Sequence, residues 1–136
     1  MGRTNRAEIE VEIQVAWGEM DAYQHVNNAV FLRWFETARI SWLDRFKFPE
    51  KEGKTGPVLR AASVEYLLPV AFPDMVTVRV WLKKLGNTSV TLAYEVSSAQ
   101  RNSVIAKGNT VVVYVDHEKG KSRALTKRFL KQLGET

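Results

Sequence analysis

The chain has 136 residues, enough for one hydrophobic core, so we expect a single domain over residues 1–136. It contains no cysteine, which excludes disulfides and thiolate zinc sites, and no apolar stretch approaches the ~20 residues that a membrane helix needs. These features predict a soluble, cytoplasmic protein, and the formal net charge of +5 either favours polyanionic partners or simply aids solubility.

The first predicted element is a strand over residues 8–16, because apolar and polar side chains alternate along it. A polar loop follows, and a long helix is predicted from about Asn28 to about Phe46. Apolar residues in this helix recur at three- and four-residue steps and also occupy further positions, which predicts a helix covered on most sides. Asn27 and Asn28 stand at its start, where an asparagine side chain can cap the amides of the first turn.

Four further strands are predicted after the helix, at about residues 58–68, 75–85, 89–98 and 104–115. Short turns between consecutive strands predict antiparallel pairing. The chain ends in a short amphipathic helix at residues 126–133. One long helix on a curved antiparallel sheet of about five strands is an α+β architecture.

The loop before the long helix carries the clearest chemical signal. Asp21 lies just ahead of the helix, whose first-turn amides and partial positive charge point toward that region. A carboxylate can act as a general base or as a nucleophile, and backbone amides can stabilise an oxyanion. The other interpretation of Asp21 is an ordinary loop aspartate that caps or is solvated.

A longer motif surrounds this aspartate. It consists of Asp21, His25-Val26-Asn27-Asn28, Phe31-Leu32-Arg33-Trp34-Phe35-Glu36, Ala38 and Arg39. The motif resembles the acyl-CoA thioesterases of the hotdog fold, in the 4-hydroxybenzoyl-CoA thioesterase-like branch. The strand from Arg60 to Tyr66, followed by Pro69 and Phe72-Pro73-Asp74, also looks like this family, so the resemblance covers nearly the whole chain.

The resemblance implies a hotdog fold, in which the sheet wraps the long helix, and hydrolysis of an acyl-coenzyme A to a free acid and coenzyme A. It implies that Asp21 is the catalytic acid and that the backbone amide of Asn28 polarises the thioester carbonyl. The leaving thiol has a pKa of about 8.5 if it behaves like cysteine's, so it departs with little help from a general acid. A carboxylate and backbone amides would then suffice, and we expect no cofactor. The resemblance also implies a homodimer with two shared sites, paired into a homotetramer as a dimer of dimers.

Several polar residues of the motif region have open roles. His25 either orients water or substrate, or donates a hydrogen bond that shapes the loop. Asn27 either caps the helix or contacts substrate. Glu19 is a secondary acid or a solvated side chain. Some hotdog enzymes use a glutamate of the helix, but Arg33 and Arg39 can each pair with Glu36, so we expect an ion-paired structural role for it.

Larger and basic side chains are the candidates for substrate binding. Trp34 and Tyr66 are candidates to line an acyl pocket, with plain core packing as the alternative for each. The basic residues considered for the phosphates of coenzyme A are Arg60, Lys83, Lys84, Lys127 and Arg128. Their alternative is an ordinary solvated position.

The motif departs from the family pattern at two positions. Gln24 stands where glycine is frequent, which predicts a loop that needs no glycine dihedral. Phe31 stands where tyrosine is common, which removes one hydroxyl. Both differences bear on substrate preference more than on the reaction.

Other functions are compatible with the sequence to different degrees. A non-catalytic binding module of the same fold, for acyl-CoA or acyl-carrier protein, stays open. A hotdog dehydratase fits less well, since its histidine would pair with a remote helix acid. Nucleic-acid binding is disfavoured because the basic residues are spread out. A metal site is not expected, because His25 and His117 are far apart in sequence and no cysteine is present.

Overall fold

The structure, a computed structural model, describes residues 5–134; residues 1–4 and 135–136 of the expected domain lie outside the described residues. The strands are β1 (Ile9–Gln14), β2 (Thr55–Tyr66), β3 (Met75–Leu85), β4 (Ser89–Ser98), β5 (Ser103–Asp116) and β6 (Lys121–Ser122). The helices are η1 (Trp17–Glu19), α1 (Asn28–Arg45) and α2 (Lys127–Gln132). The predicted long helix, the later strands and the terminal helix are therefore confirmed within a few residues, whereas η1 and β6 were not predicted.

All described strands belong to one antiparallel sheet in the order β1-β3-β4-β5-β2, with β6 beside β5. The predicted pairing of consecutive strands is confirmed for β3, β4 and β5, and it is wrong for β2, which pairs with β5 instead of β3. The reason is the connection over residues 67–74. It is too long for a tight turn, and both Leu67 and Leu68 donate backbone hydrogen bonds to the Ile105 carbonyl. The chain therefore passes the ends of β5 and β4 before it enters β3, which lies next to the other edge strand, β1.

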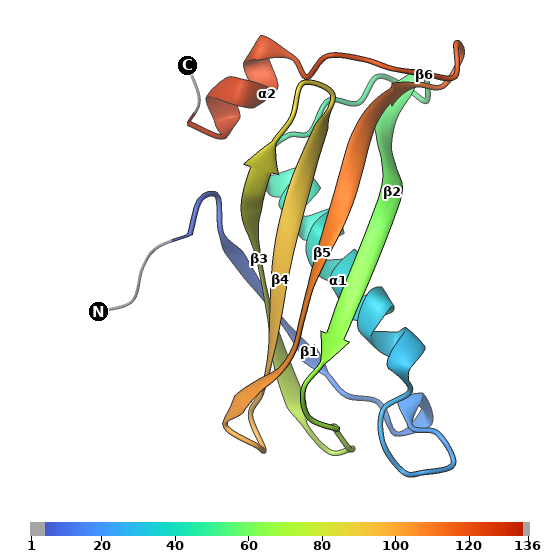
Figure 1. The fold of residues 1–136 in the computed structure, drawn as a ribbon, viewed down its shortest axis with the longest axis vertical. Coiled ribbons are helices and arrows are strands. Elements are labelled where there is room, and N and C mark those ends of the chain that lie inside the picture. Colours follow the sequence, from blue (N-terminus) through green and yellow to red (C-terminus); the bar gives the residue numbers. More distant parts are fainter. Residues whose placement is uncertain (1–4, 135–136) are drawn as a thin grey trace.

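The α1 helix lies along one face of the curved sheet (Figure 1). Its Phe35 ring stacks on Tyr94 of β4 with centroids 4.3 Å apart, and both side chains are buried. Gly108 of β5 makes this approach possible, since a side-chain carbon at that position would collide with the Phe35 ring and the Ser63 carbonyl. The sheet wraps the helix as the resemblance predicted, which is the hotdog fold.

Both α-helices begin at a capping side chain. The Asn27 side chain accepts a hydrogen bond from the Ala29 N–H at 2.9 Å, and Thr126 accepts one from the Phe129 N–H at 3.1 Å. The capping role of Asn27 is thus present in the structure. No helix within residues 5–134 is long and apolar enough to cross a membrane.

One side of α1 stays open in the single chain. Leu32 and Ile40 are exposed, so the prediction of a helix covered on most sides is wrong for an isolated chain. The physical reason is that the sheet ends at β2, next to this side of α1, so no further strand within residues 5–134 covers the helix there. β2 is itself exposed along most of its length. No described strand pairs with the outer edge of β2.

Candidate active site

The loop of residues 15–27 is tied to the connection that follows β2. The Val15 N–H donates to the Asp74 carbonyl at 2.9 Å, and the Val26 N–H donates to the Val70 carbonyl at 2.7 Å. Both segments therefore lie at the same end of the molecule, at the bottom in Figure 1. Bonds at both ends of the loop hold it in one position relative to the sheet.

A short 3-10 turn, η1, opens the loop, and Glu19 holds it together. The Ala16 N–H donates to the Glu19 Oε1 at 2.7 Å, and the Asn27 N–H donates to the Glu19 carbonyl at 2.9 Å. Glu19 therefore joins the beginning of the loop to the start of α1. This structural role differs from both the secondary acid and the solvated side chain considered from the sequence.

Asp21 sits in a tight turn between these supports. Its Oδ1 accepts a hydrogen bond from the Tyr23 N–H at 2.9 Å, while its own N–H donates to the His25 carbonyl at 2.8 Å. Among residues 5–134 no other group donates to the Asp21 carboxylate, which is partly buried. One carboxylate oxygen is therefore available to a water molecule or a substrate.

Gln24 closes this turn in a left-handed conformation, with φ of 63°. Its N–H donates to the Asp21 carbonyl at 2.9 Å. The expectation that the loop needs no glycine dihedral is therefore wrong. The loop keeps the backbone shape that glycine adopts easily, and a glutamine adopts it at a cost of about 1 kcal/mol.

The first turn of α1 offers a free amide. The Ala29 N–H bonds to the Asn27 side chain, and the Val30 N–H bonds to the Asn27 carbonyl at 2.9 Å. No described residue accepts a hydrogen bond from the Asn28 N–H, and Asn28 is exposed. The helix start thus presents a donor, reinforced by the partial positive charge of the helix.

Tyr66 at the end of β2 fixes this turn from the other side. Its hydroxyl donates to the Asn28 carbonyl at 2.8 Å, and its ring meets Phe31 edge-on with centroids 5.1 Å apart. Burial raises the pKa of the Tyr66 phenol, so the group is protonated and able to donate at neutral pH. The structure therefore brings Tyr66 to the helix start, beside the candidate amide.

A cavity of about 400 Å³ opens beside Asp21. Its lining residues are Trp17, Gly18, Met20, Asp21 and Gln24. The motif predicts no role for Trp17 or Met20. The sequence does contain a sign of a binding role for Trp17. It is a large aromatic residue in a polar loop, just after the alternation of the first strand ends, where no core position is expected.

The remaining motif residues take other positions. Trp34 is 2% exposed and packs against Phe31 with centroids 4.8 Å apart, which places it in the core. The His25 side chain is exposed and makes no hydrogen bond within residues 5–134; the loop bond at this residue runs through its backbone carbonyl. Glu36 lies 4.0 Å from Arg39, one of the two expected partners.

The structure does not bring the candidate phosphate-binding residues to Asp21 within one chain. Lys83 and Lys84 lie near the far end of β3, on the order of 30 Å along the strand from its start beside the loop. Lys83 donates to the Asn109 side chain at 3.2 Å. Arg60 occupies a register shift in the middle of β2 and is exposed. No group of three or more potential metal ligands is present among the described residues.

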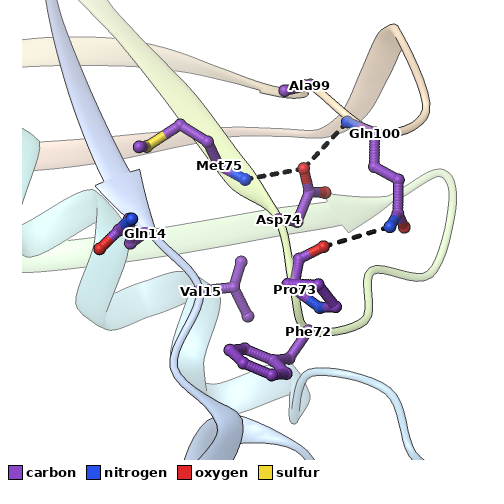
Figure 2. Close-up of a pocket in the computed structure, with 8 residues that line it drawn as sticks. All are labelled: Gln14, Val15, Phe72, Pro73, Asp74, Met75, Ala99 and Gln100. Atoms are coloured by element: carbon purple, nitrogen blue, oxygen red, sulfur yellow. Dashed lines mark hydrogen bonds between the residues drawn. The ribbon is translucent and has the colours of Figure 1, made fainter.

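A second cavity, of about 520 Å³, lies at the same end of the molecule, and Figure 2 shows the residues that line it. Its central acid is Asp74, whose Oδ1 accepts the N–H groups of Met75 at 2.8 Å and Gln100 at 2.9 Å. The Ser98 hydroxyl donates to the other oxygen. The Gln100 side chain adds a bond to the Pro73 carbonyl at 3.2 Å. Both oxygens of this carboxylate are therefore hydrogen-bonded, and they join the start of β3 to the end of β4 and the turn after it.

Comparison with known proteins supports the family assignment. The model of the thioesterase-like superfamily matches residues 15–133. The long-chain acyl-CoA thioesterase FadM of Escherichia coli is 28% identical over 120 residues, which cover 86% of this chain and 90% of that protein. A thioesterase from Thermus thermophilus, solved in complex with coenzyme A and Zn, is 31% identical with a TM-score of 0.79, and the match covers 91% of this chain and 95% of that one.

A more distant structure shares the fold. The 1,4-dihydroxy-2-naphthoyl-CoA thioesterase Slr0204 from Synechocystis superimposes with a TM-score of 0.83 at 21% identity, covering 93% of this chain and 96% of that one. The hotdog architecture is thus found again at low sequence identity. Since the family model spans most of its length, this chain belongs to the thioesterase-like superfamily.

Proposed function

We propose that the protein is an acyl-CoA thioesterase, which hydrolyses the thioester of an acyl-coenzyme A to a free acid and coenzyme A. Two features together carry the proposal. The Asp21 carboxylate has an oxygen without a hydrogen-bond donor among the described residues, and the Asn28 amide at the start of the helix that follows is free. The activity named for the E. coli relative supports the same reaction.

Asp21 can act by either of two routes. As a general base it removes a proton from water while the water oxygen attacks the thioester carbonyl carbon. As a nucleophile it forms a mixed anhydride, which water then hydrolyses. In both routes the carbonyl oxygen gains negative charge, and the Asn28 N–H is the donor that we assign to it.

The leaving group needs little help from the protein. The thiol of coenzyme A is acidic enough to leave as a thiolate. In the general-base route the thiolate then takes up the proton that Asp21 removed from water. One carboxylate and backbone amides are then sufficient, and we propose that the reaction uses no bound cofactor.

The test is Asp21→Asn, assayed by thiol release from a panel of acyl-CoAs. Asparagine keeps the acceptor for the Tyr23 N–H, so we expect an intact fold and a loss of kcat/KM of about 10²–10⁴-fold. Equal rates for variant and parent would exclude this mechanism. Tight binding of acyl-CoA by the parent without thiol release would support the binding-module alternative instead.

We also propose that the protein forms a homodimer through β2, and that two such dimers associate into a tetramer. In support, β2 is a twelve-residue edge strand with exposed apolar side chains, and α1 exposes Leu32 and Ile40 beside it. The apolar exposed residues of this region are Leu32, Ile40, Val58, Leu59 and Tyr66.

Light scattering tests the dimer. The double variant Ile40→Glu, Leu59→Glu adds charge to this surface and should break the contact along β2, which lowers the molar mass of the assembly at least twofold. The double variant Glu10→Lys, Glu12→Lys changes exposed side chains on β1, at the opposite edge of the sheet, and should leave the assembly unchanged. A monomeric parent, or an unchanged Ile40, Leu59 variant, would contradict the assignment.

A further inference from the structure

We propose that Trp17 is a specificity-determining residue, whose indole binds the acyl chain of the thioester at the Asp21 cavity. The inference rests on the proposed function, because it takes Asp21 as the group that meets the thioester. It concerns which part of the substrate this cavity holds.

Trp17 is unlike the other tryptophans of the chain. It is 72% exposed, whereas Trp34 and Trp42 are buried in the core and the Trp81 ring lies against the Arg79 guanidinium at 5.8 Å. Its backbone lies in η1, which the bond between the Ala16 N–H and Glu19 holds in place. An indole that is fixed by its backbone and left in solvent is suited to receive a ligand.

The chemistry of the cavity favours an apolar occupant. Its volume of about 400 Å³ lies within the range of small-molecule sites. Trp17 and Met20 supply apolar walls, and a Cβ atom added to Gly18 would meet no atom of a residue beyond its chain neighbours within 4 Å, so the space at Gly18 is open. None of the five lining residues carries a positive charge, so the cavity offers nothing to the phosphates of coenzyme A.

The position of Asp21 in the same lining decides the orientation. The thioester carbonyl must approach the carboxylate, so a group bonded to that carbonyl lies within a few bonds of the indole. The pantetheine arm carries two amides that need hydrogen-bond partners, and apart from Asp21 the side chains of this lining offer only the Gln24 amide and the indole N–H of Trp17. An acyl chain has no such need and gains from contact with indole and thioether.

Kinetics with acyl-CoAs of different length test this inference. For Trp17→Ala we expect KM for dodecanoyl-CoA to rise about tenfold, the loss of roughly two methylene contacts, with kcat within about threefold. Acetyl-CoA should respond less than about twofold, and Trp17→Phe should recover most of the loss. Tyr23→Ala is the matched control, since Tyr23 is 83% exposed on the same loop and lies outside the cavity lining.

Fluorescence tests binding without turnover. A non-hydrolysable dodecyl-CoA thioether should change the tryptophan emission of the parent and of Trp81→Phe, and the change should be lost in Trp17→Phe. Coenzyme A alone should produce little change. An equal response to coenzyme A would put the indole on the pantetheine arm and overturn the inference, as would an equal KM effect on acetyl- and dodecanoyl-CoA.

These outcomes separate the two proposals. If Asp21→Asn leaves hydrolysis unchanged while Trp17 still reports the thioether, the mechanism fails and the binding inference stands. If Asp21→Asn abolishes hydrolysis and Trp17 stays silent, the inference alone fails.

Discussion

Two aspartates at the same end of the molecule show how one kind of side chain serves two purposes. The Asp74 side chain accepts three hydrogen bonds, one from the next residue, Met75, and two from Ser98 and Gln100, so it joins the start of β3 to the β4–β5 turn. Figure 2 shows the bonds from Met75 and Gln100. Asp21 accepts one, from Tyr23 within its own turn. The two are linked by the bond from Val15, at the beginning of the Asp21 loop, to the Asp74 carbonyl. A carboxylate with both oxygens bonded across the fold stabilises it, and a carboxylate bonded only within its own turn keeps an oxygen for chemistry.

The largest effect on stability is expected at Asp74. Asp74→Ala leaves the N–H groups of Met75 and Gln100 and the Ser98 hydroxyl without their acceptor, so we expect a loss of about 2–4 kcal/mol of unfolding free energy. Asp21→Ala removes a single bond in an exposed turn and should cost about 1 kcal/mol or less. Urea unfolding of both variants measures the difference. Similar losses would show that the two carboxylates do not divide the roles as described.

A smaller effect is expected at Tyr66, which supports the Asp21 site without belonging to its turn. Tyr66→Phe removes the hydroxyl bond to the Asn28 carbonyl and keeps the ring contact with Phe31. We expect a stability loss of about 0.5–1.5 kcal/mol and a decrease of kcat of a few-fold, because the first turn of α1 is held less firmly. Steady-state kinetics and thermal unfolding together check this. A variant with unchanged kcat would mean that the hydroxyl serves only the fold.

The smallest effect is expected at Gln24, and its sign is opposite. Glycine adopts the φ of 63° without steric cost but also loosens the unfolded chain. We expect Gln24→Gly to stabilise the protein by about 0.5 kcal/mol and to change kcat/KM by less than about twofold. Chemical denaturation measures the gain. Clear destabilisation would show that the glutamine side chain contributes a contact that offsets the left-handed backbone.

The elements of the fold were predictable because their signals are local. Alternation in β3 and β4 and the capping residue Asn27 of α1 depend on neighbouring residues alone, and these predictions are confirmed. The partner of β2 was not predictable in this way. The partner depends on the path that residues 67–74 take across the end of the sheet, because this path leaves β2 beside β5. No local sequence pattern encodes that path.

The candidate site was predictable in its chemistry more than in its surroundings. The motif identified Asp21 and the start of α1 as candidates, and the structure adds how each is supported. The left-handed Gln24, the hydroxyl bond of Tyr66 and the exposed Trp17 are consequences of three-dimensional contacts or their absence. Lys83 shows that residue type alone can also mislead. A lysine can bind phosphate, but this one lies at the end of β3 that is distant from the Asp21 loop.

The most direct test compares kcat/KM of Asp21→Asn and Asp74→Asn on the same acyl-CoA, at a temperature where both variants are folded. Asparagine preserves a side-chain acceptor at each position, so the comparison isolates the carboxylate. We expect a loss of about 10²–10⁴-fold for Asp21→Asn and a change within about threefold for Asp74→Asn. Full activity of Asp21→Asn, or an equal loss in both variants, would contradict the assignment of Asp21 as the reacting carboxylate.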